Sequence, residues 1–276
     1  MEPTTTDDRE MSLRYAGSCT VCGDDIPRGA RAIYSPSSRS VRHVACPGLD
    51  RGVAGGSAMR EFERRKARDD ARVEAQKERV RETFGDGFIG KVATFIAVDD
   101  RPRPSTSVWE QGAVGEERVA ARLDQLAEVG VVALHDRRIP GSKANIDHLV
   151  VTPWGVWVID AKRYLNKRPD VATEGGIFGI GGVDRLTVGG RKKDELVEGV
   201  LWQIEKVRSE LGEEPAVRGI LCFVEADWPL LGGHFSVRGV RVTWPRRLAK
   251  ELLQTTPPTV DVTVVSRALA AKFPPA

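Results

Sequence analysis

The clearest pattern of hydrophobic and polar positions lies in the second half of the chain and predicts an α/β domain over about 112–272. Apolar residues with helical spacing open it and recur later, and strand-like apolar runs lie between them. In chain order the segments are EERVAARLDQLAEVG (helix), VVALHDRRI, NIDHLVV and GVWVIDAKRY (strands), KKDELVEGVLWQIEKVRSEL (helix), GILCFVEA and VRVTW (strands) and PRRLAKELLQ (helix). Helices interleaved with strands predict a sandwich around a mixed sheet.

The first half of the chain divides into four segments of different composition. Residues 1–12 are polar and predict a disordered tail, and residues 13–50 hold three of the four cysteines. Residues 57–84 lack Pro and carry nine basic and seven acidic residues between Arg60 and Glu82, which is typical of a solvated helix. Residues 86–111 contain DDRPRPSTS and predict a linker or an extended lead-in.

Composition places the chain among soluble globular proteins. Its 276 residues are 41% hydrophobic and 29% charged, and the net charge of +3 permits a nucleic-acid partner without requiring one. No apolar run is long enough for a membrane span, and the acidic N-terminus lacks the features of a secretory signal. We therefore expect a cytoplasmic protein without structural disulfides.

Three cysteines and a histidine near the N-terminus have the spacing of a zinc site. Cys19 and Cys22 are separated by two residues, and His43 and Cys46 repeat that spacing twenty residues further on. Two such pairs can close a tetrahedron around Zn²⁺, and four protein ligands would leave no open position. The pattern resembles treble-clef or ribbon-like zinc fingers, so we expect a structural module that contacts nucleic acid or protein. The alternative is a set of buried thiols and a surface histidine.

A carboxylate and a lysine lie two residues apart at the end of a predicted core strand. Residues with that spacing share one face of a strand, so Asp160 and Lys162 should point the same way, in line with Val156 and Val158. Placing both charges at the end of a core strand is costly unless they pair or serve chemistry.

Asp147 lies on the preceding strand of the predicted hairpin. If Thr152 faces Gly155 across the turn, Asp147 faces Asp160, and a bulge at Gly155 would shift this register by one residue. Either register brings two carboxylates together, and they repel unless a cation or a proton joins them. Hard divalent cations prefer oxygen ligands, which points to Mg²⁺ or Mn²⁺.

A third carboxylate belongs to the first helix of the domain. Glu116 precedes the apolar stripe formed by Val119, Ala120 and Leu123, whereas Glu117 falls on the more polar side. Glu116 is therefore the better candidate for a buried site. Its other interpretation is a carboxylate that stabilises a helix N-terminus.

Together these residues resemble the nuclease-related domain, NERD, which is assigned to the PD-(D/E)XK nuclease-like superfamily. The resemblance covers about 110–250 and rests on GAVGE (112–116), NIDH (145–148) and GVWVIDAK (155–162). It implies a restriction-endonuclease-like core in which a helix carries a Glu and a central hairpin carries Asp and then Asp-x-Lys. The residues that match these roles are Glu116, Asp147, Asp160 and Lys162.

The resemblance also implies a role for Gln203 in LWQIEKV, the position of a Gln on the following helix of the family. The family often has Asn-Pro ahead of this Gln, where this chain has Gly199 and Val200. The zinc pattern and the charged helix lie outside the resemblance.

Two functions follow from these patterns. The first is a divalent-metal-dependent nuclease that hydrolyses phosphodiester bonds in DNA or in RNA, with DNA the favoured partner, and with Glu116, Asp147 and Asp160 around Mg²⁺ or Mn²⁺. The second is a non-catalytic adaptor that binds nucleic acid or protein through the zinc module and the charged helix. Basic residues near the proposed site are either phosphate contacts or scattered solvated charges: Arg137, Arg138, Lys143, Arg163, Lys167, Arg168, Arg191, Lys192 and Lys193.

Overall fold

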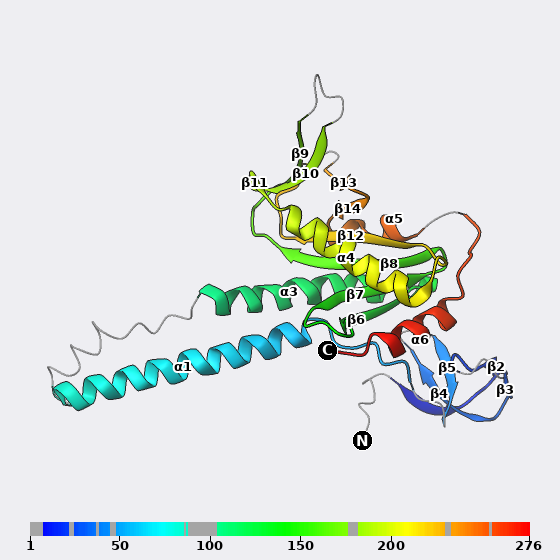
Figure 1. Cartoon of the computed structure of the whole chain (residues 1–276). Helices are drawn as coiled ribbons and strands as arrows, with labels where there is room; N and C mark the ends of the chain where they lie inside the picture. Colours follow the sequence, from blue (N-terminus) through cyan, green and yellow to red (C-terminus); the bar gives the residue numbers. More distant parts are fainter. Residues whose placement is uncertain are drawn as a thin grey trace.

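The computed structural model describes residues 8–21, 25–36, 39–44, 48–85, 87, 104–175, 182–229, 233–253 and 256–276. A six-stranded sheet forms the centre of the molecule, with helices on both faces, and a small β module and a long helix precede it (Figure 1). Within the described residues, no helix combines the length and apolar character needed to cross a membrane.

The N-terminal module is built from short strands in two small sheets. One sheet has the order β1 (Arg9–Ser12), β4 (Arg31–Ser35), β5 (Ser40–His43), and the other pairs β2 (Gly17–Ser18) with β3 (Asp25–Ile26). All pairs are antiparallel. Leu13, Cys19, Ile26 and Ala32 form its buried core, which is small for a module of this length.

The expected disordered tail over 1–12 is wrong for residues 9–12. These residues form β1, in which Arg9 pairs with Tyr34 and Ser12 pairs with Arg31 of β4. All four side chains of β1 are exposed, so the strand has no hydrophobic pattern and is held by backbone pairing. Residues 1–7 lie outside the described residues.

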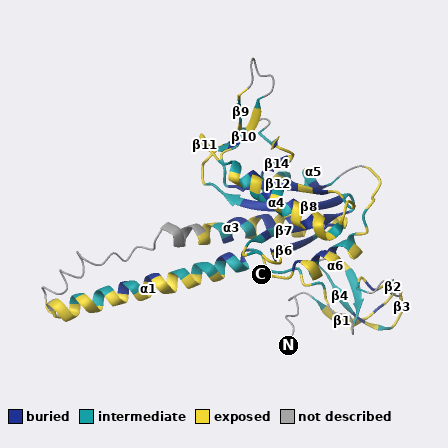
Figure 2. Ribbon diagram, in the orientation of Figure 1, coloured by how far each residue is buried: buried dark blue, intermediate teal, exposed yellow. Residues whose placement is uncertain are grey.

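The charged segment forms α1 (Gly56–Phe84), a single helix of 29 residues. Ion pairs at three- and four-residue spacing cover it, including Arg65 with Glu61 and Lys77 with Glu74. The helix extends away from the sheet beside α3 (Pro104–Asp124), and its outer part is mostly exposed (Figures 1 and 2). The two helices contact where the Arg65 guanidinium lies 5.5 Å from the ring centroid of Trp109.

The boundary expected at residue 111 is also wrong, because α3 begins at Pro104 within the predicted linker 86–111. Pro is tolerated in the first turn of a helix, so the Pro-rich composition that predicted a linker marks the start of the helix instead. Residues 88–103 lie outside the described residues.

The central sheet is mixed, as the sequence predicted. Strands β6, β7 and β8 are antiparallel neighbours, β8, β12 and β14 run parallel, and β13 returns antiparallel at the edge. The order is β13 (Phe235–Val237), β14 (Val240–Thr243), β12 (Val217–Val224), β8 (Gly155–Arg163), β7 (Asn145–Thr152) and β6 (Val132–Arg138).

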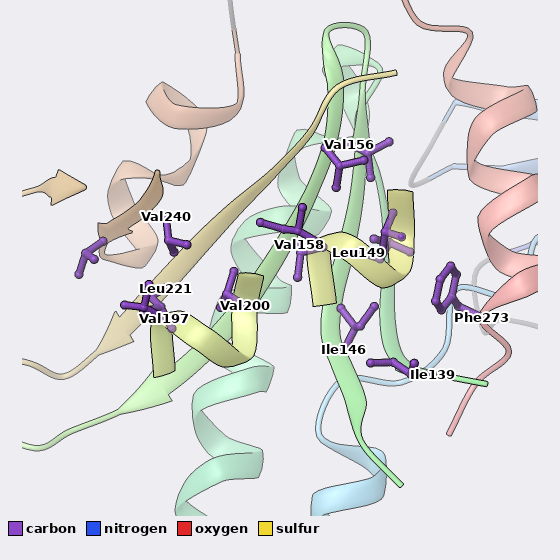
Figure 3. Packing of buried hydrophobic residues seen from close by; sticks show 14 of the residues in the cluster. Ile139, Ile146, Leu149, Val156, Val158, Val197, Val200, Leu221, Val240 and Phe273 are labelled. Atoms are coloured by element: carbon purple, nitrogen blue, oxygen red, sulfur yellow. The ribbon is translucent and has the colours of Figure 1, made fainter. Parts of the chain in front are cut away.

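Helices bury both faces of this sheet. On one face, α4 (Asp194–Leu211) contributes Val197 and Val200 to a cluster with Val156 and Val158, and α6 (Val262–Lys272) joins it (Figure 3). On the other face, α3 packs against β7 and β8, followed by the short helices η1 (Gln125–Val129), η2 (Pro245–Arg247) and α5 (Leu248–Leu252). The alternation of β8 residues between the clusters makes it the central strand of the core.

The stretch between β8 and α4 forms a second small sheet. Strands β9 (Pro169–Glu174), β10 (Val183–Val188) and β11 (Arg191–Lys192) pair antiparallel in the order β11-β10-β9. Leu186 and Val188 bury their side chains in the main core, so the sheet is anchored at its base. Residues 176–181 lie outside the described residues.

Segments from both ends of the chain cover the edge strand β6. The backbone N–H of His135 donates to Arg51 O at 2.6 Å, and the N–H of Arg138 donates to Pro274 O at 2.8 Å. Arg137 is fully buried and donates to the carbonyls of Asp50, Ala270 and Phe273. The main domain therefore extends past residue 272 to the end of the sequence, and Arg137 is unavailable for the phosphate contact considered above.

The close approach of Gly52 to β6 predicts that alanine substitutions at two glycines will differ in their effect on stability. Gly52 and Gly141 both have a φ of +71°, but a Cβ on Gly52 would lie 2.1 Å from His135 O and one on Gly141 would meet no atom within 4 Å. We expect Gly52→Ala to lower the free energy of unfolding by roughly 2–3 kcal/mol and Gly141→Ala by about 1 kcal/mol. Urea unfolding of both variants measures this, and equal losses would contradict the close approach.

Candidate active site

The β7–β8 hairpin brings two aspartates together. Thr152 faces Gly155 and His148 faces Ile159, which confirms the predicted register across the turn. One step further along the same register, Asp147 lies opposite Asp160. The backbone N–H of Ala161 donates to Asp147 Oδ2 at 2.9 Å, so the Asp147 carboxylate is held against the strand that carries Asp160.

Asp160 and Lys162 point to the same side of β8, as strand geometry predicted. The Lys162 ammonium donates to Asp160 Oδ1 and, at 3.4 Å, to the carbonyl of Ala161. Asp160 is only 7% exposed. An ion pair so poorly solvated costs desolvation energy that the pairing must offset, which sets it apart from the exposed ion pairs on α1.

Glu116 enters the site from α3 and is bound by the segment that precedes α1. Its Oε2 accepts the backbone N–H of Gly55 at 3.0 Å, and the neighbouring Glu117 is exposed. Gly55 has a φ of +70°, and a Cβ there would lie 3.0 Å from Ala113 O, so the chain passes very close to α3 at this point. The Glu116 carboxylate therefore does bind a helix N-terminus, but this is the N-terminus of α1 and not that of its own helix, α3.

A fourth carboxylate, Asp136 on β6, was missed from the sequence. It is 3% exposed and has a φ of +47°. In the β6–β7 register, His135 faces His148 and Arg137 faces Ile146, so Asp136 lies beside Asp147 on the neighbouring strand. It accepts the N–H of Ser57 at 2.6 Å and the Ser57 hydroxyl at 2.7 Å, which caps α1 from another part of the chain. The sequence offered one indication of a role for Asp136, its place between buried positions of VALHDRR, but its partner Ser57 is 79 residues away in the chain.

Burial and mutual repulsion raise the pKa of these carboxyl groups. Burial and the charge of Asp136 raise the pKa of Glu116 to about 7, and the Gly55 N–H partly offsets this. Burial, and then the charges of Glu116 and Asp160, raise the pKa of Asp147 well above its ordinary value. The cluster therefore contains more negative charge than its own cation can balance.

Lys162 is the cation of this cluster. Burial lowers the pKa of its ammonium, but the carboxylates of Asp160 and Asp147 outweigh that effect, and the net pKa is above the ordinary lysine value. Lys162 is thus protonated at neutral pH in the absence of a bound metal, and it acts as a hydrogen-bond donor and positive charge rather than as a base.

The four carboxylates do not form a closed metal cage. Within the described residues, no three or more His, Cys, Asp and Glu side chains gather closely enough to hold a metal ion. Asp147 and Asp160 are adjacent. Glu116 instead accepts the N–H of Gly55, which precedes α1, and Asp136 accepts the N–H of Ser57 in the first turn of α1.

Gln203 reaches the same region from α4. Its Nε2 donates to the carbonyl of Asn145 at 3.3 Å, two residues before Asp147 on β7. The Asn145 side chain in turn donates to Ser57 Oγ at 3.0 Å and to Asp136 Oδ1 at 3.3 Å. Gln203 therefore touches the backbone that positions Asp147, and it contacts none of the four carboxylates in the described structure.

His148 lies on the face of β7 opposite Asp147. It is fully buried, its Nδ1 is 2.9 Å from Nδ1 of His135, and His135 Nε2 is 3.1 Å from Asp124 Oδ1. Burial, together with the neighbouring His135, holds the pKa of His148 well below its ordinary value. Through His135, which lies beside Asp124 at the end of α3, these two imidazoles link α3 to the sheet.

The zinc pattern is only partly within the described residues. Cys19 is 2% exposed, and its sulfur accepts the backbone N–H groups of Val21 and His43, each at 3.3 Å. The module thus brings the first cysteine and the histidine of the pattern together. Cys22 and Cys46 lie outside the described residues.

The family model described as NERD: Nuclease-related domain matches residues 111–224. This stretch includes Glu116, Asp147, Asp160, Lys162 and Gln203, and it ends at the last residue of β12. The central part of the chain is therefore similar to nuclease-related domains. No curated protein matches the chain, and no solved structure matches it.

The raised pKa of Glu116 predicts a pH-dependent stability. A carboxyl whose folded pKa lies above its unfolded value destabilises the fold as it ionises, so this loss grows from about pH 4.5 to above pH 7. Without added divalent metal, Glu116→Gln should melt several degrees above wild type at about pH 8 and close to it near pH 5, since about 1 kcal/mol shifts the melting temperature by roughly 2–4 °C. Glu117→Gln is the exposed control, and identical pH profiles for the two variants would refute the assignment.

Proposed function

We propose that this chain is a divalent-metal-dependent nuclease that hydrolyses phosphodiester bonds in DNA or in RNA, with DNA the favoured substrate. The observation that carries the proposal is the half-buried Asp147 beside the buried Asp160, with Lys162 two residues after Asp160 on β8. The nuclease-related domain match over 111–224 supports it, because all of these residues lie within the matched stretch.

The donor chemistry of the site fits Mg²⁺ or Mn²⁺. Asp147 and Asp160 offer adjacent carboxylate oxygens of the kind that hard divalent cations prefer, and burial, followed by the charges of Glu116 and Asp160, raises the pKa of Asp147. Glu116 is a further ligand, directly or through water, once its carboxylate leaves the Gly55 N–H. A cation held there would activate a water molecule and neutralise charge on the phosphate.

The residues of the chain supply the remaining functions. The Lys162 ammonium, already aimed at Asp160, can orient the attacking water or donate to a phosphate oxygen as negative charge develops. The Ala161 N–H fixes the orientation of Asp147, and Gln203 holds the backbone at Asn145. Each of these contacts positions a group before the substrate arrives, which reduces the reorganisation that the reaction requires.

Removing the central carboxylate should abolish cleavage. We expect Asp160→Ala to lose at least about a hundredfold of any Mg²⁺- or Mn²⁺-dependent cleavage of DNA, because the loss of one electrostatic group in an active site costs roughly that much. Asp70→Ala, an exposed carboxylate on α1, is the matched control. Circular dichroism establishes that both variants fold, and cleavage at the wild-type rate by a folded Asp160→Ala would overturn the proposal.

We further propose that the N-terminal module binds one structural Zn²⁺ through Cys19, Cys22, His43 and Cys46 and that it helps to place the nuclease domain on its substrate. The two N–H groups that point at the Cys19 sulfur support this, because such donors stabilise a thiolate and a thiolate is the form that binds zinc. The small core of the module supports it too, since so few buried residues stabilise a fold weakly without a metal.

Zinc content tests this assignment directly. Elemental analysis of the purified protein should give about one zinc per chain, and Cys19→Ser should abolish it because structural zinc requires all four ligands. Cys222→Ala is the control, since Cys222 is a fully buried thiol of β12 in the main core. Equal zinc content in the two variants would contradict the proposed ligand set.

The second candidate is a non-catalytic adaptor that binds nucleic acid or protein. It is favoured by one observation: Glu116 and Asp136 are saturated by the N–H groups of Gly55 and Ser57 rather than grouped around a vacant metal position. Metal-independent binding of nucleic acid by the wild-type chain, with no cleavage in either metal, would support the adaptor over the enzyme.

A further inference from the structure

A second cavity lies beside the proposed active site, at the carboxyl end of β12. It measures about 700 Å³, which is within the range of small-molecule and nucleotide sites. Its floor begins at Phe223, which pairs with Lys162 across the β8–β12 ladder, so the cavity starts one strand away from the catalytic lysine. Neighbouring strands are about 4.8 Å apart, which places the opening within reach of a nucleotide next to the scissile phosphate.

Aromatic rings line one side of this cavity. The ring centroids of Trp228 and Trp244 are 4.9 Å apart, and Trp228 also contacts Phe223 at 6.4 Å. Both tryptophans keep part of their surface accessible, and the indole Nε1 of Trp228 is buried with no hydrogen-bond partner in the described part of the chain. The rings offer a flat apolar surface, which suits a ligand that is itself flat.

Arginines also belong to the lining of the cavity. Arg118 and Arg122 come from α3, and Arg246 comes from η2. Among the described residues of the lining, the one acidic residue is Glu225, which is paired with Arg118 and with Arg163 at the end of β8. Arg122 and Arg246 are exposed, so the cavity keeps an excess of positive charge that faces solvent.

We propose that this cavity binds an unpaired nucleotide of the substrate strand, with its base against Trp228 and Trp244 and its phosphate near Arg122 and Arg246. Aromatic rings next to a basic surface form the combination that binds single-stranded nucleic acid. A paired base is stacked inside its duplex and cannot enter such a cavity without being extruded. The site therefore selects single strands, frayed ends or flipped nucleotides.

This inference rests on the proposed function for its substrate but is tested without catalysis. Fluorescence anisotropy of labelled oligonucleotides, with no added magnesium or manganese, should show tighter binding of single-stranded DNA than of a duplex of equal length. A parallel single-stranded RNA arm determines whether the 2′-hydroxyl matters. Equal affinity for single strand and duplex, or no measurable binding of nucleic acid, would overturn the cavity assignment.

Trp244→Ala should weaken single-strand binding by about tenfold and leave duplex binding almost unchanged, because base–aromatic stacking contributes on that scale. Trp202→Ala is the matched control, since Trp202 lies on α4 and is 39% exposed. Trp244→Phe keeps an aromatic ring and should retain most of the affinity, so a folding defect in the alanine variant can be recognised. Wild-type single-strand affinity in a folded Trp244→Ala would overturn the proposal.

Arg122→Ala provides a readout that a packing change would not produce. Loss of one phosphate contact should reduce the slope of log affinity against log salt by about 0.7 for a single strand, whereas Arg79→Ala on the exposed face of α1 should leave it unchanged. An unchanged slope would remove Arg122 from the site. Absence of cleavage by the wild type, with selective single-strand binding intact, would overturn the nuclease proposal alone.

Discussion

The placement of four carboxylates and one lysine at a poorly solvated position is the constraint around which this structure is organised. Like charges in such a place are stable only when each has a partner. Asp160 has Lys162, Asp147 has the Ala161 N–H, and Glu116 and Asp136 have the N–H groups of Gly55 and Ser57. Gly55 precedes α1 and Ser57 lies in its first turn. The hydrogen bonds that stabilise Glu116 and Asp136 therefore also fix the position of the start of the long helix.

This attachment joins the nuclease-related stretch to segments outside it. Residues 50–57 and 270–276 lie beyond the family match, yet they cover the edge of β6 and surround the buried Arg137. An uncovered edge strand invites pairing with other chains, so these segments protect the sheet as they position α1. Residues 50–57, which follow the N-terminal module, therefore contact the carboxylate cluster through backbone N–H groups, and a change in their position would alter the hydrogen bonds of Glu116 and Asp136.

The cavity that we propose as a nucleotide site extends beyond the family match. The match ends at Val224, and the cavity with Trp228 and Trp244 is completed by residues 225–246. In the proposed function, the hairpin residues would supply the chemistry, and the segment after the match would supply shape and charge for a ligand. Such a division is common where the reacting groups lie on a rigid sheet and specificity lies on connecting segments.

The sequence by itself determined the elements whose evidence is local. Strand parity placed Asp160 and Lys162 on one side, the two-residue turn set the register that brings Asp147 to Asp160, and the helical stripe separated Glu116 from Glu117. Only the tertiary structure decided the rest. The partners of Asp136 and Arg137 are distant in the chain, the exposed strand β1 has no hydrophobic pattern, and Trp228 and Trp244 meet only after β12 and β14 pair. Periodicity records which face a residue presents, but not which distant segment will cover that face, because that depends on the packing of the whole fold.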